Sequence, residues 1–242
     1  MLGKCGCPGN PATPFGGPAS GLWPSGSSSP SPSPVLAPCR IANLISTCFT
    51  ACTGINPCGF IVATAPGTAQ FESDRVLLGN DGINTLGLLA TPHADGFDSL
   101  NATMQYKIIQ FNDPAGSGGS YSVIVTDDTG FAVFQVQLFD DGTLFVVVNG
   151  TQYNGTWTPM PGGDLLVHYF TEAGVPRLFL NGIEVPLVLF GPNVSFVFPN
   201  ILLVGAETPV ANSKAAYDFM FVDTSPIPPT AVFCCPDGTL SR

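Results

Sequence analysis

The residues best suited to catalysis in this sequence are few and widely separated. Enzymes that cleave glycosidic bonds place two carboxylates on either side of the scissile bond. The chain has four glutamates, and Glu72 has an acid two positions away, Asp74, so that both would share one face of a strand. No third acid follows, and the sequence contains no G-x-S-x-G motif, phosphate-binding loop or dinucleotide fingerprint. We therefore expect no catalytic pair at this position.

The two histidines, His93 and His168, are not expected to be catalytic either. His168 lies in the middle of an apolar strand pattern, where a packed and hydrogen-bonded ring is the usual role. His93 lies in a predicted loop. We expect that the chain is not an enzyme, has no catalytic residues and needs no cofactor.

Tyr153 and Trp157 are the candidate glycan-binding residues, because aromatic rings beside polar groups are typical of sugar sites. Asn154 and Thr156 flank them. The alternative is that the two rings belong to the edge of the core or to a subunit contact.

Aspartates at predicted turns suggest calcium as a second ligand, because calcium prefers oxygen donors. Turn-forming chemistry explains the same residues without a metal, since aspartate side chains accept hydrogen bonds from turn backbones. No metal site is therefore predicted. The residues concerned are Asp95, Asp98, Asp127, Asp128, Asp140 and Asp141.

The cysteines form two groups, six near the N-terminus and two near the C-terminus. An even number in a loop-rich segment is typical of disulfides. Free thiols and zinc remain alternatives, although the spacings are not the usual Cys-x2-Cys pairs. The vicinal pair Cys234 and Cys235 is expected to bond different partners and to tie the chain end to the N-terminal region. The eight disulfide candidates are Cys5, Cys7, Cys39, Cys48, Cys52, Cys58, Cys234 and Cys235.

A short helix is predicted over residues 39–52. Apolar residues recur there with the i, i+3, i+4, i+7 spacing of one helix face. Pro38 precedes the segment and Gly54 follows it, as start and stop signals.

The remainder, from about residue 59 to residue 223, reads as successive β-hairpins. Apolar runs rich in Val, Phe, Ile and Thr alternate with turn dipeptides, among them Asn149-Gly150, Asn154-Gly155 and Asn181-Gly182. Asn-Gly between two such runs is the strongest short-range hairpin signal. The pattern predicts an all-β fold, a two-sheet antiparallel jelly-roll sandwich.

Four segments of this region occur in the same order as four strands of a known kind of domain. They are residues 69–73, 165–185, 202–205 and 216–222. In order and spacing they resemble the opening strand, the core hairpin, the "L-x-I-G" strand and the closing strand of concanavalin A-like, laminin G-like jelly rolls. The resemblance extends from about residue 60 to residue 226 and implies two curved antiparallel sheets. It implies no single activity, because this fold occurs in lectins, glycanases, adhesion modules and virion proteins.

Composition divides the chain into three parts. Residues 1–58 are predicted to be an extended Pro/Ser/Gly-rich and Cys-containing anchoring arm, residues 59–226 the jelly roll and residues 227–242 a tail with a cysteine pair. The arm has nine prolines between residues 8 and 38, and residues 1–71 carry no acid. Such a segment cannot bury enough apolar surface to form a core of its own. It is either a flexible linker or an anchor that lies on a partner, and we favour the anchor.

Charge excludes two classes of partner. The net charge is −10, and no cluster of lysines or arginines exists, which argues against nucleic acid and against a charged membrane surface. No secretory signal is expected at the N-terminus, because no apolar stretch follows Lys4.

The sequence favours a non-enzymatic structural component of a large assembly. The specific prediction is a virion protein (a minor capsid, decoration or tail-associated protein) anchored to neighbouring structural subunits by its arm. The alternative is a carbohydrate-binding adhesion or receptor-binding module on the same fold, located outside the cell and bound to a cell-surface glycan.

Overall fold

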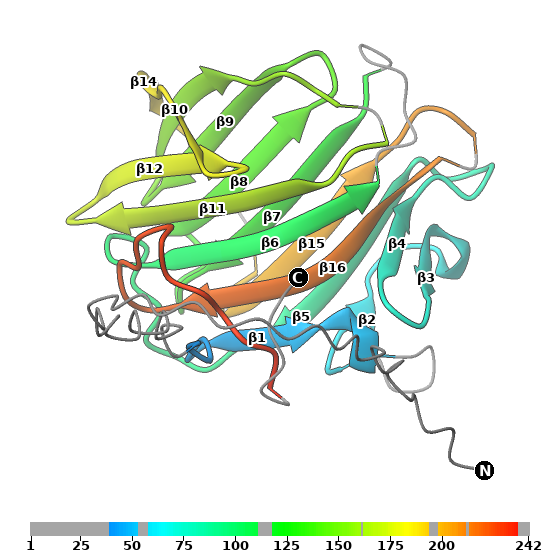
Figure 1. The fold of residues 1–242 in the computed structure, drawn as a ribbon, viewed down its shortest axis with the longest axis horizontal. Helices are drawn as coiled ribbons and strands as arrows, with labels where there is room; N and C mark the ends of the chain where they lie inside the picture. The colour runs from blue at the N-terminus through cyan, green and yellow to red at the C-terminus, as the bar shows by residue number, and fades with distance from the viewer. Residues whose placement is uncertain are drawn as a thin grey trace, which may run out of the picture. The chain divides into compact units, whose positions relative to one another are not determined.

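The computed structural model describes residues 39–52, 58–110, 118–160, 162–193, 198–211 and 213–236. Cys5, Cys7 and most of the predicted arm lie outside these residues. The described strands form two antiparallel sheets, as the sequence predicts (Figure 1). Among the described residues no helix is long and apolar enough to cross a membrane.

The first sheet has eight strands among the described residues. They are β1 (Ile45–Cys48), β3 (Ala69–Phe71), β4 (Val76–Gly79), β6 (Thr103–Gln110), β11 (Leu165–Glu172), β12 (Val175–Leu180), β13 (Ile183–Val185) and β16 (Lys214–Asp223). Their order across the sheet is β13-β12-β11-β6-β16-β4-β3, and β1 pairs with the second half of β16. Because β16 is long, it pairs with β4 along its first residues and with β1 along its last.

The second sheet also has eight described strands. They are β2 (Ile61–Val62), β5 (Leu86–Pro92), β7 (Ser120–Thr126), β8 (Val133–Phe139), β9 (Thr143–Val148), β10 (Thr151–Thr156), β14 (Val188–Pro192) and β15 (Ile201–Glu207). Their order is β14-β10-β9-β8-β7-β15-β5-β2. Three of its seven strand pairings, β7–β8, β8–β9 and β9–β10, are hairpins of consecutive strands, and the other four pair strands that are not consecutive in the chain.

The core lies between the two sheets and follows from the period of two along each strand. Every second residue of β8 and β9 points inward, among them Phe134 and Val146, and both are fully buried. The rings of Phe134 on β8 and Tyr169 on β11 stack across the sandwich, with centroids 4.3 Å apart. Stacked rings from opposite sheets fix how the two layers face one another.

The hairpin turns predicted from Asn-Gly dipeptides are present at two of the three positions. Asn181 and Gly182 have φ angles of 49° and 80°, the left-handed pair that a tight hairpin requires. Asn149 and Gly150 form the corresponding turn between β9 and β10. The predicted turn at Asn154-Gly155 is wrong, because these residues lie inside β10 and pair with β9. Gly155 is needed there for space, since a Cβ atom would lie 3.0 Å from the side chain of Leu144.

The predicted helix over residues 39–52 is also wrong. The segment forms β1, antiparallel to β16, and only Phe49–Ala51 makes a 3-10 turn. A helix of this length has little stability of its own. Pairing with β16 and a disulfide at Cys48 outweigh the local apolar period.

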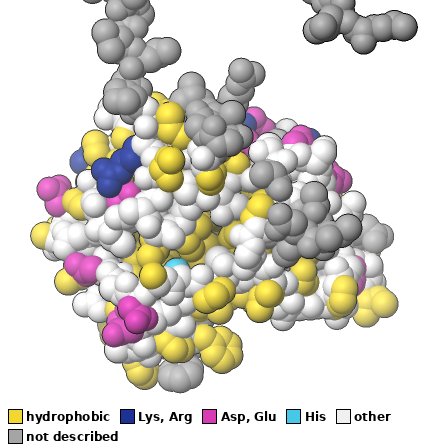
Figure 2. Space-filling model, turned by 90° about the horizontal axis from the view of Figure 1, so that it is seen from below, with side chains coloured by type: hydrophobic (Ala, Val, Ile, Leu, Met, Phe, Trp, Pro, Cys, Tyr) yellow, Lys and Arg dark blue, Asp and Glu magenta, His cyan; other side chains and the backbone are white. Residues whose placement is uncertain are grey.

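The low charge content predicts an unusually uncharged surface. Figure 2 shows one face of the molecule, on which charged side chains are few and are separated by uncharged and hydrophobic surface. The predicted boundaries at residues 58 and 226 stay a prediction.

Two buried tyrosines, Tyr106 and Tyr217, differ in one contact. The hydroxyl of Tyr217 donates a hydrogen bond to the carbonyl oxygen of Gly205 at 2.9 Å. The hydroxyl of Tyr106 has no hydrogen-bond partner among the described residues, and burial raises its pKa well above the usual range. An unsatisfied buried hydroxyl costs about 1–3 kcal/mol.

We therefore expect Tyr106→Phe to raise the free energy of unfolding by about 1 kcal/mol, because it removes a polar atom that is buried without a partner. Tyr217→Phe is the matched control and should lower the free energy of unfolding by about 1 kcal/mol. Urea unfolding of the two variants and the wild type measures both changes. Equal destabilisation by the two substitutions would contradict the expectation.

Candidate functional site

A segment that follows β16, residues 224–236, crosses the outer face of the first sheet (Figure 1). We call it the tail segment. Its start is hydrogen-bonded to β6: Thr103 Oγ1 donates to the carbonyl oxygen of Ser225 at 2.7 Å, and the amide of Ile227 donates to Thr103 Oγ1 at 2.8 Å. The outer face of the sheet is therefore partly covered by the chain itself.

Aromatic rings hold the middle of the tail segment on β16. Phe219 and Phe221 point to the same outer face, with ring centroids 5.0 Å apart. Phe233 of the tail segment stacks on Phe221 at 5.3 Å. All three rings are buried, together with Ile227 and Ala42, in a small apolar cluster separate from the main core.

Disulfides fix the end of the tail segment. Cys234 bonds Cys39, and Cys235 bonds Cys48 on β1. The vicinal cysteines therefore have different partners, and they tie the chain end to the N-terminal part, as expected. A third disulfide joins Cys52 and Cys58.

An ion pair strengthens the same junction. Arg40 Nε and Nη2 donate to the two carboxylate oxygens of Asp223 at 3.2 and 3.1 Å. Asp223 is fully buried, and it also accepts the amide of Asn43 at 3.2 Å. A buried carboxylate needs such partners, because losing its hydration without compensation costs several kcal/mol.

His168 of β11 contacts the tail segment from the sheet. Its Nε2 lies 2.8 Å from the carbonyl oxygen of Ile227, and its Nδ1 lies 3.2 Å from Nε2 of Gln105. A carbonyl only accepts and an amide nitrogen only donates, so His168 is neutral with its proton on Nε2. The ring is packed and hydrogen-bonded, the role that the sequence predicts for it.

Burial lowers the pKa of His168, and the hydrogen bond to Ile227 opposes this only in part. The aromatic rings of Phe170 and Phe179 flank the imidazole, and the guanidinium of Arg177 lies over both rings at 5.5 and 5.2 Å. No carboxylate is hydrogen-bonded to the imidazole among the described residues. Protonation is therefore unfavourable in the folded state.

We expect stability to fall as the pH is lowered below about 6.5, the pKa of a histidine in the unfolded chain. The neutral ring contributes its full stability above that pH, and the unfolded state gains a proton below it that the folded state resists. Melting temperatures between about pH 7 and pH 5 measure the effect, with His168→Gln as the comparison. The variant keeps a donor for Ile227 and should lose this part of the pH dependence; equal slopes would contradict the assignment.

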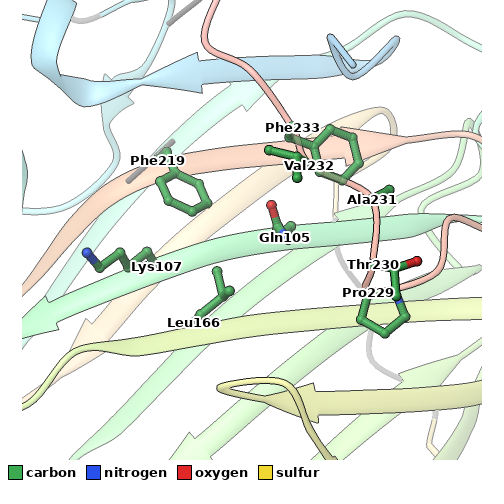
Figure 3. A pocket seen from close by; sticks show the side chains of 9 residues that line it. All are labelled: Gln105, Lys107, Leu166, Phe219, Pro229, Thr230, Ala231, Val232 and Phe233. Carbon is green, nitrogen blue, oxygen red and sulfur yellow. The ribbon is translucent and has the colours of Figure 1, made fainter. Parts of the chain in front are cut away.

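A cavity of about 310 Å³ lies between the tail segment and the sheet (Figure 3). Its floor consists of Gln105 and Lys107 on β6, Leu166 on β11 and Phe219 on β16. Residues 229–233 of the tail segment form the opposite wall. Nε2 of Gln105 donates to His168, which leaves its Oε1 to accept hydrogen bonds from a ligand.

Lys107, the charged residue of the cavity lining, is paired with two aspartates outside the lining. The ammonium of Lys107 lies 3.1 Å from a carboxylate oxygen of Asp164 and 4.0 Å from one of Asp218. Burial raises the pKa of Asp218, while the positive charge of Lys107 lowers it. The cavity lining thus combines aromatic rings, an amide and the ammonium group of Lys107, the arrangement that orients a polar ligand.

The sequence candidates Tyr153 and Trp157 do not lie in this cavity. Tyr153, on β10, packs against the main core. Trp157 follows β10, and its Nε1 donates to the carbonyl oxygens of Phe139 and Thr143 at 3.0 and 3.2 Å. The Trp157 ring lines a second opening, of about 400 Å³, in which Tyr153 has no part.

The acids that the sequence analysis considered serve local structure. Glu72 and Asp74 lie in the turn between β3 and β4, and both pair with Arg75, at 3.5 and 2.6 Å. That contact lowers the pKa of Asp74, the opposite of what a general acid needs. The aspartates Asp98, Asp127 and Asp141 each accept backbone amides of their own turns.

Among the described residues no group of three or more His, Cys, Asp or Glu is placed to hold a metal ion. His93 lies in the loop after β5, where its Nε2 is 2.8 Å from the carbonyl oxygen of Thr126.

Solved structures share this architecture. The transglycosylase Crh5 superposes with a TM-score of 0.53 at 8% identity, over 83% of this chain and 93% of that chain. The fold is a concanavalin A-like jelly roll. A prokaryotic β-1,3-1,4-glucanase (lichenase) from a mouse hindgut metagenome has a TM-score of 0.50 at 12% identity, over 76% of this chain and 100% of that chain. The carbohydrate-binding module CBM66 from Bacillus subtilis has a TM-score of 0.45 at 13% identity, over 68% and 95%.

At these identities the likeness establishes the jelly-roll fold and no activity. No protein-family model and no curated protein matches the sequence. This jelly-roll fold contains both enzymes and binding modules, so the choice between them depends on the cavity itself.

Proposed function

We propose that this jelly roll is a non-enzymatic carbohydrate-binding module whose ligand occupies the cavity under the tail segment. The observation that carries the proposal is the lining of that cavity, with the Phe219 ring beside the Gln105 amide and the Lys107 charge. Sugars present apolar C–H faces and polar hydroxyls together, so that a ring and directional polar groups suit them. A volume of about 310 Å³ holds one sugar residue rather than a long chain.

The related folds support the class of ligand. A transglycosylase and a glucanase act on carbohydrates with the same two-sheet architecture. The proposed site lies on the outer face of the first sheet, between that face and the tail segment.

The position of Lys107 supports binding without cleavage. Glycoside hydrolysis needs two carboxylates with the scissile bond between them. Here the ammonium of Lys107 lies between Asp164 and Asp218 and contacts both. Incubating the protein with a bound glycan should release no shortened product. Release of new reducing ends that Asp218→Asn abolishes would contradict the non-enzymatic assignment.

A glycan array, followed by calorimetric titration of the best ligand, tests the site. Lys107→Met keeps the apolar stem and removes the charge, and we expect it to weaken binding at least about tenfold, the value of a lost hydrogen bond to a charged group. Trp157→Phe is the matched control at the second opening and should bind as the wild type does. Loss of binding in Trp157→Phe alone would move the site to that opening, and the absence of any bound glycan would overturn the proposal.

The predicted virion role, with its structural partners and its location, depends largely on the arm. That part of the chain lies outside the described residues, so the role stays a prediction.

A further inference from the structure

Three of the four strands that end the two sheet orders are protected against further pairing. β2 has two residues and β3 has three. β13 carries Glu184, whose carboxylate accepts two hydrogen bonds from Arg177 at 2.8 and 2.9 Å. Short length and charge on an edge strand discourage another strand from adding to it.

β14 is neither as short as β2 and β3 nor charged, although it ends in Pro192 and its pairing with β10 shifts register between Gln152 and Tyr153. It spans five residues and pairs with β10 on one side. Residues 185–193 contain no charge. In Figure 1 β14 lies at the margin of the second sheet, next to β10.

The side chains of β14 are uncovered on both faces of the strand. Val188, Leu189 and Phe190 are consecutive, so that they cannot all share one face, yet they are 69%, 63% and 69% exposed. Together they present on the order of 350 Å² of apolar surface, the size of the largest apolar patch on many monomers. Such a patch is typical of an interaction site.

Charge indicates which partner fits. The chain has a net charge of −10, so that two copies repel one another over most of their surface. β14 is a place where they can meet without bringing like charges together. When two identical strands pair in antiparallel fashion, a twofold axis relates the two copies. Each contact then occurs twice, once from each copy, and no surface is left for a third copy.

We propose that β14 pairs with β14 of a second copy of this chain and joins the two second sheets into one continuous sheet across a twofold axis. Among the described residues no strand pairs with the other edge of β14, and this edge supplies the hydrogen bonds of the pairing. The exposed Val188, Leu189 and Phe190 side chains cover one another. The patch is smaller than the roughly 800 Å² per partner of a standard interface. The dimer is therefore concentration-dependent and about half formed at on the order of 100 µM.

Sedimentation velocity of the full chain, from about 5 µM to about 500 µM, tests this. The wild type should change from monomer to dimer over that range. Phe190→Lys places two like charges across the axis and should weaken dimerisation at least about thirtyfold. The matched control is Ile83→Lys, which adds the same charge at a side chain that is 89% exposed in a turn; it should dimerise as the wild type does.

A wild type that stays monomeric throughout would overturn the proposal. So would a dimer that Phe190→Lys and Ile83→Lys leave equally intact, because the contact would then lie elsewhere, for example in the arm. If Phe190→Lys proves misfolded by circular dichroism, amide exchange of the wild type decides instead. Protection of residues 188–191 should rise with protein concentration, and protection that is independent of concentration would refute the pairing.

Discussion

Removing the Cys39–Cys234 and Cys48–Cys235 disulfides together is expected to lower the free energy of unfolding by about 8 kcal/mol, well over twice the loss from removing either one. The two bonds close loops of 195 and 187 residues, but they are not independent. Either bond alone already brings the two chain ends together in the unfolded state. The remaining bond then closes only the short ring between Cys39, Cys48 and the adjacent Cys234 and Cys235.

The loop-entropy relation gives the magnitudes. The first closure of a loop near 190 residues is worth about 5 kcal/mol, and the second closure of a ring near ten residues about 3 kcal/mol. Cys39→Ala/Cys234→Ala should therefore cost about 3 kcal/mol, and Cys48→Ala/Cys235→Ala about the same. The loss of both is comparable with the total stability of an ordinary domain, about 5–15 kcal/mol, so that the fourfold variant should be only marginally stable and should unfold at low guanidinium concentration.

Guanidinium unfolding of the two double variants and the fourfold variant measures this non-additivity. The control is Cys52→Ala/Cys58→Ala, which opens a loop of six residues and should add its cost of about 2 kcal/mol to either background without coupling. Peptide mapping without reductant checks the pairing beforehand. A fourfold variant that loses only the sum of its two halves would contradict the argument.

Phe221→Ala is expected to lower the free energy of unfolding by about 3–5 kcal/mol. Phe221 is fully buried and lies between Phe219 and Phe233 in the ring stack. Its removal leaves a hole between β16 and the tail segment. The disulfides keep that segment from leaving, so the surrounding atoms can close the hole only in part.

Denaturant unfolding measures the loss, and Phe131→Ala, at a ring that is 55% exposed, is the control, with an expected change within about 0.5 kcal/mol. Because Phe219 forms the floor of the cavity, Phe221→Ala should also weaken any glycan binding. Unchanged stability would show that the ring stack contributes little to holding the tail segment.

The fold was predictable from sequence because its signals are local. Alternation along each strand and the Asn181-Gly182 turn depend on neighbouring residues, and both appear in the structure. The errors arise where distant contacts decide. β1 forms because β16 and Cys235 are beside it. Asn154 and Gly155 continue β10 because they pair with β9, at a position where a Cβ atom on Gly155 would be tightly packed against Leu144.

The cavity was not predictable in the same way. Gln105, Lys107 and Phe219 come from strands that are neighbours in space and far apart in the chain. Each also has an ordinary strand role, so that no spacing distinguishes it. The signal that pointed to the region was the pair Cys234 and Cys235, which predicted that the chain end is tied to the N-terminal region. The aromatic candidates Tyr153 and Trp157 were chosen for their residue types. In the structure Tyr153 packs against the core and Trp157 lines a separate opening.

The Cys39–Cys234 bond has a mechanical consequence. When the chain is pulled from its two ends, tension passes from Cys39 to Cys234 through one covalent bridge, and the sheets between them carry no load. A single-molecule extension experiment should therefore show almost no lengthening from unfolding of the sandwich until the bridges are reduced. A protein held at one end in an assembly and pulled at the other would keep its jelly roll folded under force.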